Sequence, residues 1–277
     1  WHHTRMGEYT YACSDFKFKK GLVSATKTSG HTLQIADGLW LDKKFKAAMM
    51  KSIAQSELDR KRFVYSDIGF ILLQQVVEAV TGKTLDAYLV SEFYRPMGLE
   101  HTLFQPLNRY KKADIMPTAA NDYLRRQDLC GYVHDEAAAF MGGVSGNAGL
   151  FSTAQELGKI YQMILNEGEL DGKRYLRPET CRIFTTEKSA VSHRGLGYDK
   201  PNLKDPKANA CASSAPASVY GHTGFTGTCA WVDPENDLVY IFLSNRLCPD
   251  AWNGKLNSMK IRQAVQEVIY QSLYTPE

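Results

Sequence analysis

The most constraining feature of the sequence is an apolar stripe that runs from residue 68 to residue 80. Its members recur at the three- and four-residue spacing of one helix face: Ile68, Leu72, Leu73, Val76, Val77 and Val80. Thr81-Gly82 follows at once, and glycine commonly ends a helix because it adopts the left-handed conformation without a steric penalty. The stripe therefore predicts an amphipathic helix that stops at Thr81-Gly82.

Further helical periodicity lies on both sides of this stripe. Apolar residues predict one helix before it and a shorter helix after it, which ends ahead of Pro96: Phe45, Met49 and Ile53, then Leu85, Leu89 and Phe93. Ser152 and Gln155 have the spacing of a capping box at the start of another helix. Its predicted buried face comprises Leu157, Ile160, Tyr161, Ile164 and Leu165. Residues 1–40 are predicted to be extended and loop-rich, and residues 104–148 and 186–218 to be irregular.

The pattern changes to strands after residue 218. Short runs at residues 219–223, 228–232 and 238–244 have strand composition, and the turn residues 233–237 join the last two. A final helix is predicted to cover one face of the resulting antiparallel sheet with Ile261, Val265, Val268 and Ile269. Helices followed by an antiparallel hairpin and a covering helix predict an α+β fold rather than alternating βαβ units.

Composition excludes several classes of partner. The chain has 277 residues, 44% of them hydrophobic, which is enough for a substantial core. Its net charge of +3 gives no reason to expect a nucleic acid, and no run approaches the roughly 20 apolar residues that a membrane helix needs. The cysteines are dispersed and include no Cys-x-x-Cys pair of the kind that binds zinc. Cys130 and His134 are close in sequence, but no second pair of metal ligands lies near them. We expect neither a metal nor a cofactor.

The glycine-rich run at residues 142–149 matches no catalytic loop. The chain contains neither the phosphate-binding Gly-x-x-x-x-Gly-Lys sequence nor a dinucleotide-binding Gly-x-Gly-x-x-Gly sequence. Gly143-Val144-Ser145-Gly146-Asn147 fails the Gly-x-Ser-x-Gly pattern of a nucleophile elbow, because asparagine stands where the last glycine is needed. A sharp turn ahead of a capped helix explains the run.

Two triplets carry possible chemistry. Tyr65-Ser66-Asp67 stands immediately before the apolar stripe, which places the tyrosine at a helix entrance. His222-Thr223-Gly224 ends the first predicted strand of the hairpin. Each triplet alone also has an ordinary structural explanation, since a capped helix or a strand end has the same composition.

In their order and context, these triplets and three further segments resemble the β-lactamase-related serine hydrolases, a group of class C β-lactamases, D-alanyl-D-alanine carboxypeptidases and esterases. The segments are Tyr65-Ser66-Asp67-Ile68-Gly69-Phe70, Pro96-Met97-Gly98-Leu99-Glu100-His101-Thr102, Gly149-Leu150-Phe151-Ser152-Thr153-Ala154, Gly221-His222-Thr223-Gly224-Phe225-Thr226-Gly227 and Ser244-Asn245-Arg246. Within the group, the chain is most similar to domains that follow a glycoside hydrolase family 3 domain, so an upstream domain of that kind is an expected partner.

The resemblance implies a fold and an organisation. We expect the β-lactamase and DD-peptidase fold, an antiparallel sheet flanked by helices plus a mostly helical lobe, with its N-terminal part missing. One domain would span residues 1–277, with a helical lobe at about 40–215 and the sheet hairpin and last helix at 216–277. A bacterial cell-envelope or periplasmic location follows from the same resemblance.

The resemblance also assigns roles. Tyr65 would be the general base, His222 and Thr223 would contact the substrate, and Asp67 and Gly224 would line the same cleft. The backbone N–H of Phe225 would be one donor to the oxyanion of the reaction. A tyrosine has an ordinary pKa of about 10 and needs a shift of about three units to act as a base near pH 7. A neighbouring ammonium can supply that shift, so the role of Tyr65 requires a lysine partner.

The nucleophile is the point at which the sequence departs from the family pattern. Relatives place a serine at the start of a buried helix with a lysine one turn later on the same face. Ser-x-x-Lys occurs at Ser14/Lys17 and Ser24/Lys27, but neither serine precedes an apolar stripe. We expect the true pair to precede Trp1. An alternative makes Ser24 and Lys27 the catalytic pair.

Two substitutions bear on the substrate. Asp67 replaces the more usual asparagine, so an anion stands where relatives have an amide donor. His222 replaces a lysine, and histidine is mostly uncharged near neutral pH. Both changes favour an ester, an amide or a cell-wall peptide over penicillins. The competing hypothesis is a non-catalytic domain of the same fold that binds cell-wall peptide or glycan.

Overall fold

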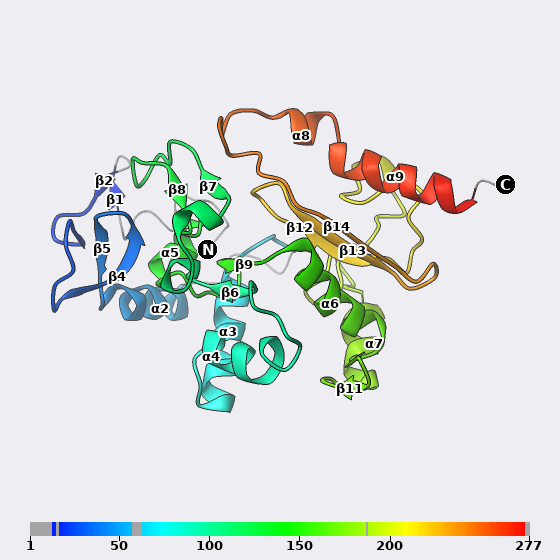
Figure 1. Ribbon diagram of the computed structural model, residues 1–277, viewed down its shortest axis with the longest axis horizontal. Coiled ribbons are helices and arrows are strands. Elements are labelled where there is room, and N and C mark those ends of the chain that lie inside the picture. Colours follow the sequence, from blue (N-terminus) through cyan, green and yellow to red (C-terminus); the bar gives the residue numbers. More distant parts are fainter. Residues whose placement is uncertain (1–12, 15–16, 57–62, 187, 275–277) are drawn as a thin grey trace. The chain divides into compact units, whose positions relative to one another are not determined.

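A computed structural model describes residues 13–14, 17–56, 63–186 and 188–274. The chain divides into two compact units (Figure 1). Unit 1 comprises residues 1–95 and 102–151, and unit 2 comprises residues 96–101 and 152–277. The organisation as one domain with a boundary near residue 215 stays a prediction.

Unit 1 combines short strands with helices. Its strands are β1 (Cys13–Ser14), β2 (Lys17–Phe18), β3 (Val23–Ser24), β4 (His31–Ala36), β5 (Leu39–Asp42), β6 (Leu103–Phe104), β7 (Pro117–Ala119), β8 (Leu129–Cys130) and β9 (Leu150–Phe151). Its helices are α2 (Phe45–Gln55), α3 (Ile68–Thr81), α4 (Leu85–Leu89), the π-helical η1 (Val90–Tyr94), the 3₁₀ turns η2 (Pro106–Asn108) and η3 (Lys112–Asp114), and α5 (Glu136–Phe140). The strands pair antiparallel in the order β3-β5-β4 and as β1-β2, β6-β9 and β7-β8.

The hairpin β4-β5 lies in the segment that the sequence predicts as loop-rich. Its register shifts between His31 and Leu33 and again between Gln34 and Ala36. Such irregularities interrupt the two-residue alternation that identifies a strand. The segment is therefore extended, as predicted, but it forms a sheet that no sustained period reveals.

Helix α2 confirms the periodicity before the apolar stripe. Phe45, Met49 and Ile53 are all buried, and they belong to the core of unit 1. The ring of Phe45 lies 5.2 Å from that of Phe140 in an edge-to-face contact. Phe140 ends α5, a buried helix that the sequence analysis assigns to an irregular segment.

Helix α3 has the predicted bounds, but most of its apolar stripe is exposed among the described residues. Gly82 ends the helix with a φ of 66°. The buried residues are Ile71 and Gln74, whereas Leu73 is 57% and Val80 81% exposed. The periodicity thus predicts the helix correctly and does not identify its buried side.

The glycine-rich run at residues 142–149 explains which side of α3 is buried. The N–H of Gly146 donates to Gln74 Oε1 at 3.1 Å, and Gln74 Nε2 donates to the carbonyl of Val144 at 3.3 Å. A Cβ on Gly146 would lie 2.2 Å from the carbonyl oxygen of Phe70. The run is therefore a packing surface for α3, and only glycine permits the close approach.

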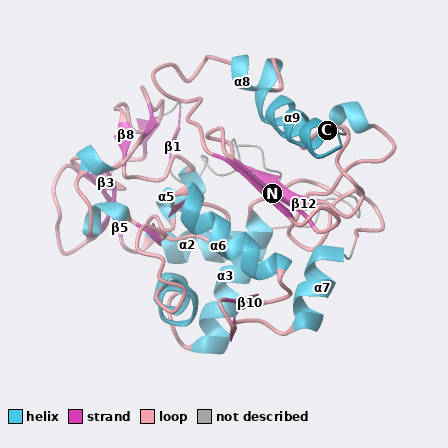
Figure 2. Cartoon of the chain, turned by 45° about the vertical axis from the view of Figure 1, so that its right-hand side comes forward, coloured by secondary structure: helices cyan, strands magenta, loops and turns pink. Residues whose placement is uncertain are grey.

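Unit 2 has one three-stranded sheet between helices (Figures 1 and 2). Its elements are α6 (Ala154–Leu165), β10 (Glu169–Leu170), β11 (Lys173–Arg174), α7 (Pro178–Thr186), the 3₁₀ turn η4 (Pro206–Ala208), β12 (Tyr220–Thr223), β13 (Cys229–Asp233), β14 (Leu238–Phe242), α8 (Lys255–Ser258) and α9 (Ile261–Tyr274). The order β12-β13-β14 is antiparallel, which confirms the predicted hairpin and α+β class. Strands β10 and β11 form a separate antiparallel pair.

The cap of α6 lies one residue later than predicted. Thr153, and not Ser152, is the N-cap, because its side chain accepts a hydrogen bond from the N–H of Glu156. Glu156 in turn accepts hydrogen bonds from the backbone N–H groups of Glu100 and His101 at 2.9–3.0 Å. The Glu156 carboxylate therefore ties the backbone of Glu100 and His101 to α6.

Helix α9 covers the sheet as predicted, and Ile269 of the predicted residues packs against the core of unit 2, but the fully buried residues are others. Gln266 and Tyr270 are buried, whereas Val265 and Val268 are exposed. The hydroxyl of Tyr270 donates to Asp233 Oδ2 at 2.8 Å, and Gln266 Oε1 accepts from the N–H of Ala212 at 2.8 Å. Hydrogen bonding makes burial of these polar groups possible, so hydrophobicity alone misplaces the buried face.

Candidate active site

The His-Thr-Gly sequence ends strand β12 and begins a tight turn into β13. His222 pairs with Ala230, and Thr223 with Cys229. The N–H of Gly224 donates to the carbonyl of Thr228 at 2.7 Å, which closes the turn. A Cβ on Gly224 would lie 2.1 Å from Thr228 Oγ1. A larger residue at this position would therefore require the Thr228 side chain to move.

Arg246 holds the other side of the same turn. Its guanidinium carbon lies 4.2 Å from the centre of the Phe225 ring, and its Nε donates to the carbonyl of Phe225 at 2.6 Å. Its backbone N–H donates to the carbonyl of Thr226 at 2.8 Å. The turn that carries Phe225 is thus fixed from both the backbone and the ring.

His222 is held at both ring nitrogens. Arg194 Nη1 lies 2.9 Å from His222 Nε2, and His222 Nδ1 lies 2.7 Å from the carbonyl oxygen of Thr223. A guanidinium can only donate hydrogen bonds, so Nε2 must accept and the proton must be on Nδ1. The guanidinium of Arg194 therefore places a positive charge beside the His222 ring.

A buried carboxylate positions Arg194. Asp199 Oδ2 accepts from Arg194 Nη2 at 3.2 Å, and Asp199 Oδ1 lies 2.9 Å from His193 Nε2. The backbone of Asp199 also exchanges hydrogen bonds with Gly221 of β12, at 2.7 and 3.1 Å. Residues 193–199 are therefore fixed against the strand that carries His222.

Sequence reasoning misses this group, because it treats residues 186–218 as an irregular polar segment. Arg194 and His222 are 28 residues apart and share no motif. The only sequence feature that could point to Arg194 is the adjacent His193-Arg194 pair, and such a pair is also common in solvent-exposed loops.

Tyr65 lies at the entrance of α3, as its position before the stripe predicts. Its side chain is 43% exposed. Ser66 Oγ accepts from the N–H of Ile68 at 3.3 Å, and the carbonyl of Asp67 accepts from the N–H of Phe70 at 3.0 Å. The Asp67 carboxylate makes no capping hydrogen bond to the helix.

The candidate residues belong to different units. Tyr65 and Asp67 are part of unit 1, whereas Thr223, Gly224 and Phe225 follow one another with His222 in unit 2. Their convergence on one cleft stays a prediction, and so do their catalytic and substrate-binding roles.

Neither Ser-x-x-Lys sequence has the geometry of a nucleophile and its base. Ser24 lies in strand β3 opposite Trp40, its Oγ accepts from the N–H of Thr26 at 3.3 Å, and Lys27 Nζ lies 5.6 Å from the Trp40 ring centre. Ser14 and Lys17 pair across the antiparallel strands β1 and β2. The required arrangement places both side chains on one helix face, whereas both serines are in strands and Lys27 lies in the loop after β3.

The described residues offer no metal centre. Among residues 13–14, 17–56, 63–186 and 188–274, no three His, Cys, Asp or Glu side chains cluster as metal ligands would. In the same part of the chain, no helix combines the length and the apolar character needed to cross a membrane.

Comparison with known families decides the classification. The Beta-lactamase family model matches residues 25–262. The chain belongs to the beta-lactamase family. This membership establishes the predicted resemblance to β-lactamase-like serine hydrolases and the fold class.

Curated relatives and solved structures of this beta-lactamase-family chain agree with that assignment. A protein of Escherichia coli (strain K12) named "Putative D-alanyl-D-alanine carboxypeptidase" is 38% identical over 197 residues, which cover 67% of this chain and 45% of that protein. A protein of the same name from Salmonella gallinarum (strain 287/91 / NCTC 13346) is 32% identical over 227 residues, 76% of this chain and 52% of its own length. The chain thus spans about half the length of these relatives.

Two solved structures show the same fold. Simvastatin synthase (LovD) from Aspergillus terreus aligns with a TM-score of 0.51 at 17% identity and covers 78% of this chain and 57% of its own. EstCE1, a hydrolase with promiscuous acyltransferase activity, aligns with a TM-score of 0.51 at 19% identity and covers 77% and 59%. At these identities, the likeness concerns the fold alone.

Proposed function

We propose that this chain is part of a serine hydrolase that transfers the acyl group of an ester, an amide or a cell-wall peptide. The family match over residues 25–262 is the observation that carries the proposal. The names of the curated relatives, D-alanyl-D-alanine carboxypeptidases, favour a peptide that ends in D-alanine. A bacterial envelope location fits such a substrate.

The proposed mechanism divides its roles between the two units. A serine attacks the acyl carbon, and a lysine with Tyr65 accepts the proton of its hydroxyl. The N–H of Phe225 and the N–H of the nucleophile stabilise the oxyanion, and water then hydrolyses the acyl-enzyme. Thr223 and Gly224 line the substrate, and the Asp67 carboxylate holds the catalytic lysine or a substrate amine.

Arg194 supplies the charge that binds a substrate carboxylate in this proposal. His222 accepts a hydrogen bond from Arg194 and carries no proton on Nε2, so it does not replace the cationic lysine of relatives. Arg194 provides a cation at the same strand end, held in place by Asp199. His222 then acts as a positioning residue for the guanidinium.

We further propose that the nucleophilic serine is outside the printed sequence, because the serines of both Ser-x-x-Lys sequences are in strands rather than at a helix start. A serine-reactive fluorophosphonate probe tests this directly. The chain as printed should remain unlabelled, and a longer natural form that carries a helical Ser-x-x-Lys should be labelled and should hydrolyse a D-alanyl-D-alanine peptide. Labelling of the printed chain that Ser24→Ala abolishes would contradict the proposal and support Ser24 with Lys27.

The strand location of both serines also favours a second function, a cell-wall peptide or glycan binding domain without catalysis. Equilibrium binding separates the two. A binding domain should retain muropeptide or glycan with no turnover even when every natural flanking segment is present. Turnover by the longer form excludes this alternative.

The fusion to an upstream glycoside hydrolase domain stays part of the proposal. A glycosidase and a peptide hydrolase on one chain would act on the two components of the same polymer. Sequencing of the gene upstream of Trp1 tests the arrangement.

A further inference from the structure

Unit 2 contains a cavity of about 490 Å³ that the proposed mechanism does not use. It lies where the end of α6, helix α7 and the start of β12 meet. Its lining includes Ile164, Leu165, Lys188, Lys200, Tyr220 and Pro234. This volume is in the range of small-molecule sites.

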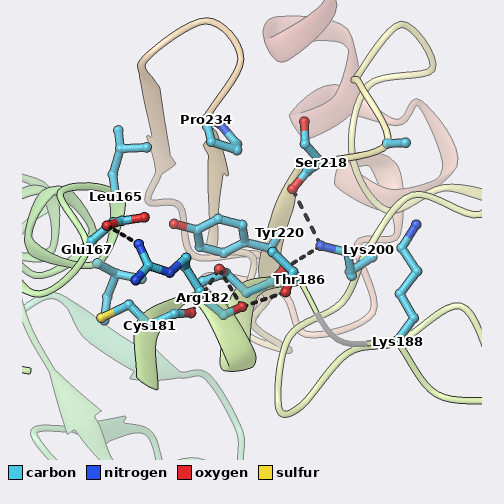
Figure 3. Close-up of a pocket in the computed structure, with 13 residues that line it drawn as sticks. Leu165, Glu167, Cys181, Arg182, Thr186, Lys188, Lys200, Ser218, Tyr220 and Pro234 are labelled. Carbon is cyan, nitrogen blue, oxygen red and sulfur yellow. Dashed lines mark hydrogen bonds and ion pairs between the residues drawn. The ribbon is translucent and has the colours of Figure 1, made fainter. Parts of the chain in front are cut away.

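Lys200 is the unusual residue of this cavity. The residue is only 3% exposed. Its Nζ donates to the carbonyl of Thr185 at 2.6 Å and lies 3.4 Å from that of Ser218, and it lies 5.7 Å from the centre of the Tyr220 ring (Figure 3). Among the residues that the structure describes, no carboxylate forms an ion pair with this ammonium. Buried charges are ordinarily paired.

The charges around the cavity add to this imbalance. The described lining contains three cations, Arg182, Lys188 and Lys200, and one anion, Glu167. Glu167 is already paired with Arg182 at 2.7 Å, and Arg182 also contacts Glu179. Burial and the charge of Lys188 lower the pKa of Lys200 from 10.5 to about 8. The Lys200 end of the cavity therefore has excess positive charge.

Hydroxyl groups in the lining offer few further donors. Thr185 Oγ1 donates to the carbonyl of Cys181, and Thr186 Oγ1 to that of Arg182. Ser218 Oγ donates to Glu235 at 2.6 Å. The ammonium groups of Lys188 and Lys200 are therefore the main donors for a bound anion. The choice between a phosphate and a carboxylate on an apolar body depends on the rest of the lining.

The opposite part of the lining is apolar. In Figure 3, Tyr220 separates Lys200 from Leu165, and Pro234 lies over the tyrosine ring. Ile164 completes this surface. An apolar chain attached to the carboxylate would cover Tyr220 and reach Leu165.

We propose that this cavity binds a small organic carboxylate, with its oxygens at Lys200 and Lys188 and its apolar body against Tyr220, Ile164 and Leu165. The site differs from the His222 region, because its described lining includes none of residues 222–225. It does not depend on the proposed hydrolase activity.

Titration with hexanoate tests the proposal on the printed chain, with 1-hexanol and inorganic phosphate as comparison ligands at constant ionic strength. Amide chemical shifts should show saturable binding of hexanoate, at least about tenfold tighter than 1-hexanol or phosphate. Hexanoate should also raise the pKa of Lys200, measured from the ¹³C shifts of reductively methylated lysines. Equal affinity for hexanol, or preference for phosphate, would overturn the proposal.

Variants locate the site. Lys200→Met should reduce hexanoate affinity by about tenfold or more, and Ala217→Asp, which adds a carboxylate at an exposed lining position, should reduce it by about fivefold. Lys159→Met is the matched control, because Lys159 is exposed on α6 outside the lining. An unchanged affinity in Ala217→Asp excludes the site even if Lys200→Met fails to fold.

Glu187 is the neighbouring acidic residue of the sequence and is outside the described residues. Its variant Glu187→Gln should leave hexanoate binding within about twofold of the parent. Binding that appears only in Glu187→Gln would show that the chain supplies its own carboxylate, and the proposal would be wrong.

Discussion

The surroundings of His222 in unit 2 and of Tyr65 in unit 1 differ in how many contacts hold each proposed site residue. Around His222, hydrogen bonds from Arg194, the backbone of Thr223 and the closed turn at Gly224 fix each group. Around Tyr65, the helix that follows fully buries only Ile71 and Gln74 among the described residues, and most of its apolar stripe is exposed.

The strand end of unit 2 and the entrance of α3 in unit 1 thus differ in how far local contacts fix their side chains before a substrate binds. In unit 2, hydrogen bonds within the sheet and the turn hold Thr223 and Phe225. The entrance of α3 in unit 1 depends on a helix whose burial is incomplete within the described chain. We therefore expect substrate contacts in unit 2 to be present from the start and the proton-transfer group of unit 1 to depend more on its surroundings.

Removal of the Tyr65 hydroxyl should have the largest effect on activity. In a form of the protein that turns over a D-alanyl peptide, Tyr65→Phe should lower kcat by about 10²–10⁴-fold, because a positioned general base contributes that much. KM should change little. A matched Tyr110→Phe control, a half-buried tyrosine elsewhere in unit 1, should retain kcat. A Tyr65→Phe variant with full kcat would remove this residue from the mechanism.

The buried and exposed sides of α3 should differ strongly in their contribution to stability. Ile71 is fully buried, so Ile71→Ala should lower the free energy of unfolding by about 2–5 kcal/mol. Val80 is 81% exposed, and Val80→Ala should change it by less than about 0.5 kcal/mol. Urea unfolding followed by circular dichroism measures both. Similar losses in the two variants would mean that the exposed face is covered in solution.

Lys200 should make the stability of unit 2 depend on pH in a specific direction. Because the folded pKa of about 8 is below the ordinary value of 10.5, the unfolded chain binds more protons between these values and stability rises with pH there. The rise amounts to about 3 kcal/mol. The Lys200→Met variant has no ammonium at this position and should lack this rise. The difference in free energy of unfolding between variant and parent should therefore favour the variant most below pH 8 and fall towards pH 10.5. A difference independent of pH would contradict the burial of this charge.

Arg194 should control recognition of a substrate carboxylate. Arg194→Gln should raise KM for a peptide with a C-terminal carboxylate by about 10–100-fold, as expected for loss of a charged hydrogen bond. The corresponding methyl ester should lose much less. An equal loss for both substrates would instead indicate that Arg194 only maintains the fold around His222.

Local patterns predict much of this fold and little of the packing. The spacing of Phe45, Met49 and Ile53 identifies α2 because its period and its buried face coincide. The stripe of α3 gives the helix bounds, but its buried face depends on Gly146, 72 residues from its partner Gln74. Gln266 and Tyr270 of α9 are buried because distant groups satisfy their hydrogen bonds.

The candidate site divides in the same way. Tyr65-Ser66-Asp67 and His222-Thr223-Gly224 are contiguous motifs and can be identified from the sequence. Arg194 and Asp199 are in a segment without periodicity, and the contacts of Asp199 with Gly221 and of Arg194 with His222 place them beside β12. The sequence pattern does not predict these contacts, because they form only when residues 193–199 and strand β12 come together in the folded chain.

The central claim is that Tyr65 and His222 line one cleft with space for a hydroxyl nucleophile. A crystal structure of the longer natural form, with a D-alanyl phosphonate bound to its serine, measures this directly. The account predicts that the Tyr65 hydroxyl lies within hydrogen-bond reach of the nucleophile or its lysine, with Thr223 and Arg194 against the ligand. Electron density that places the two rings on separate surfaces, with the ligand touching only one of them, would contradict it.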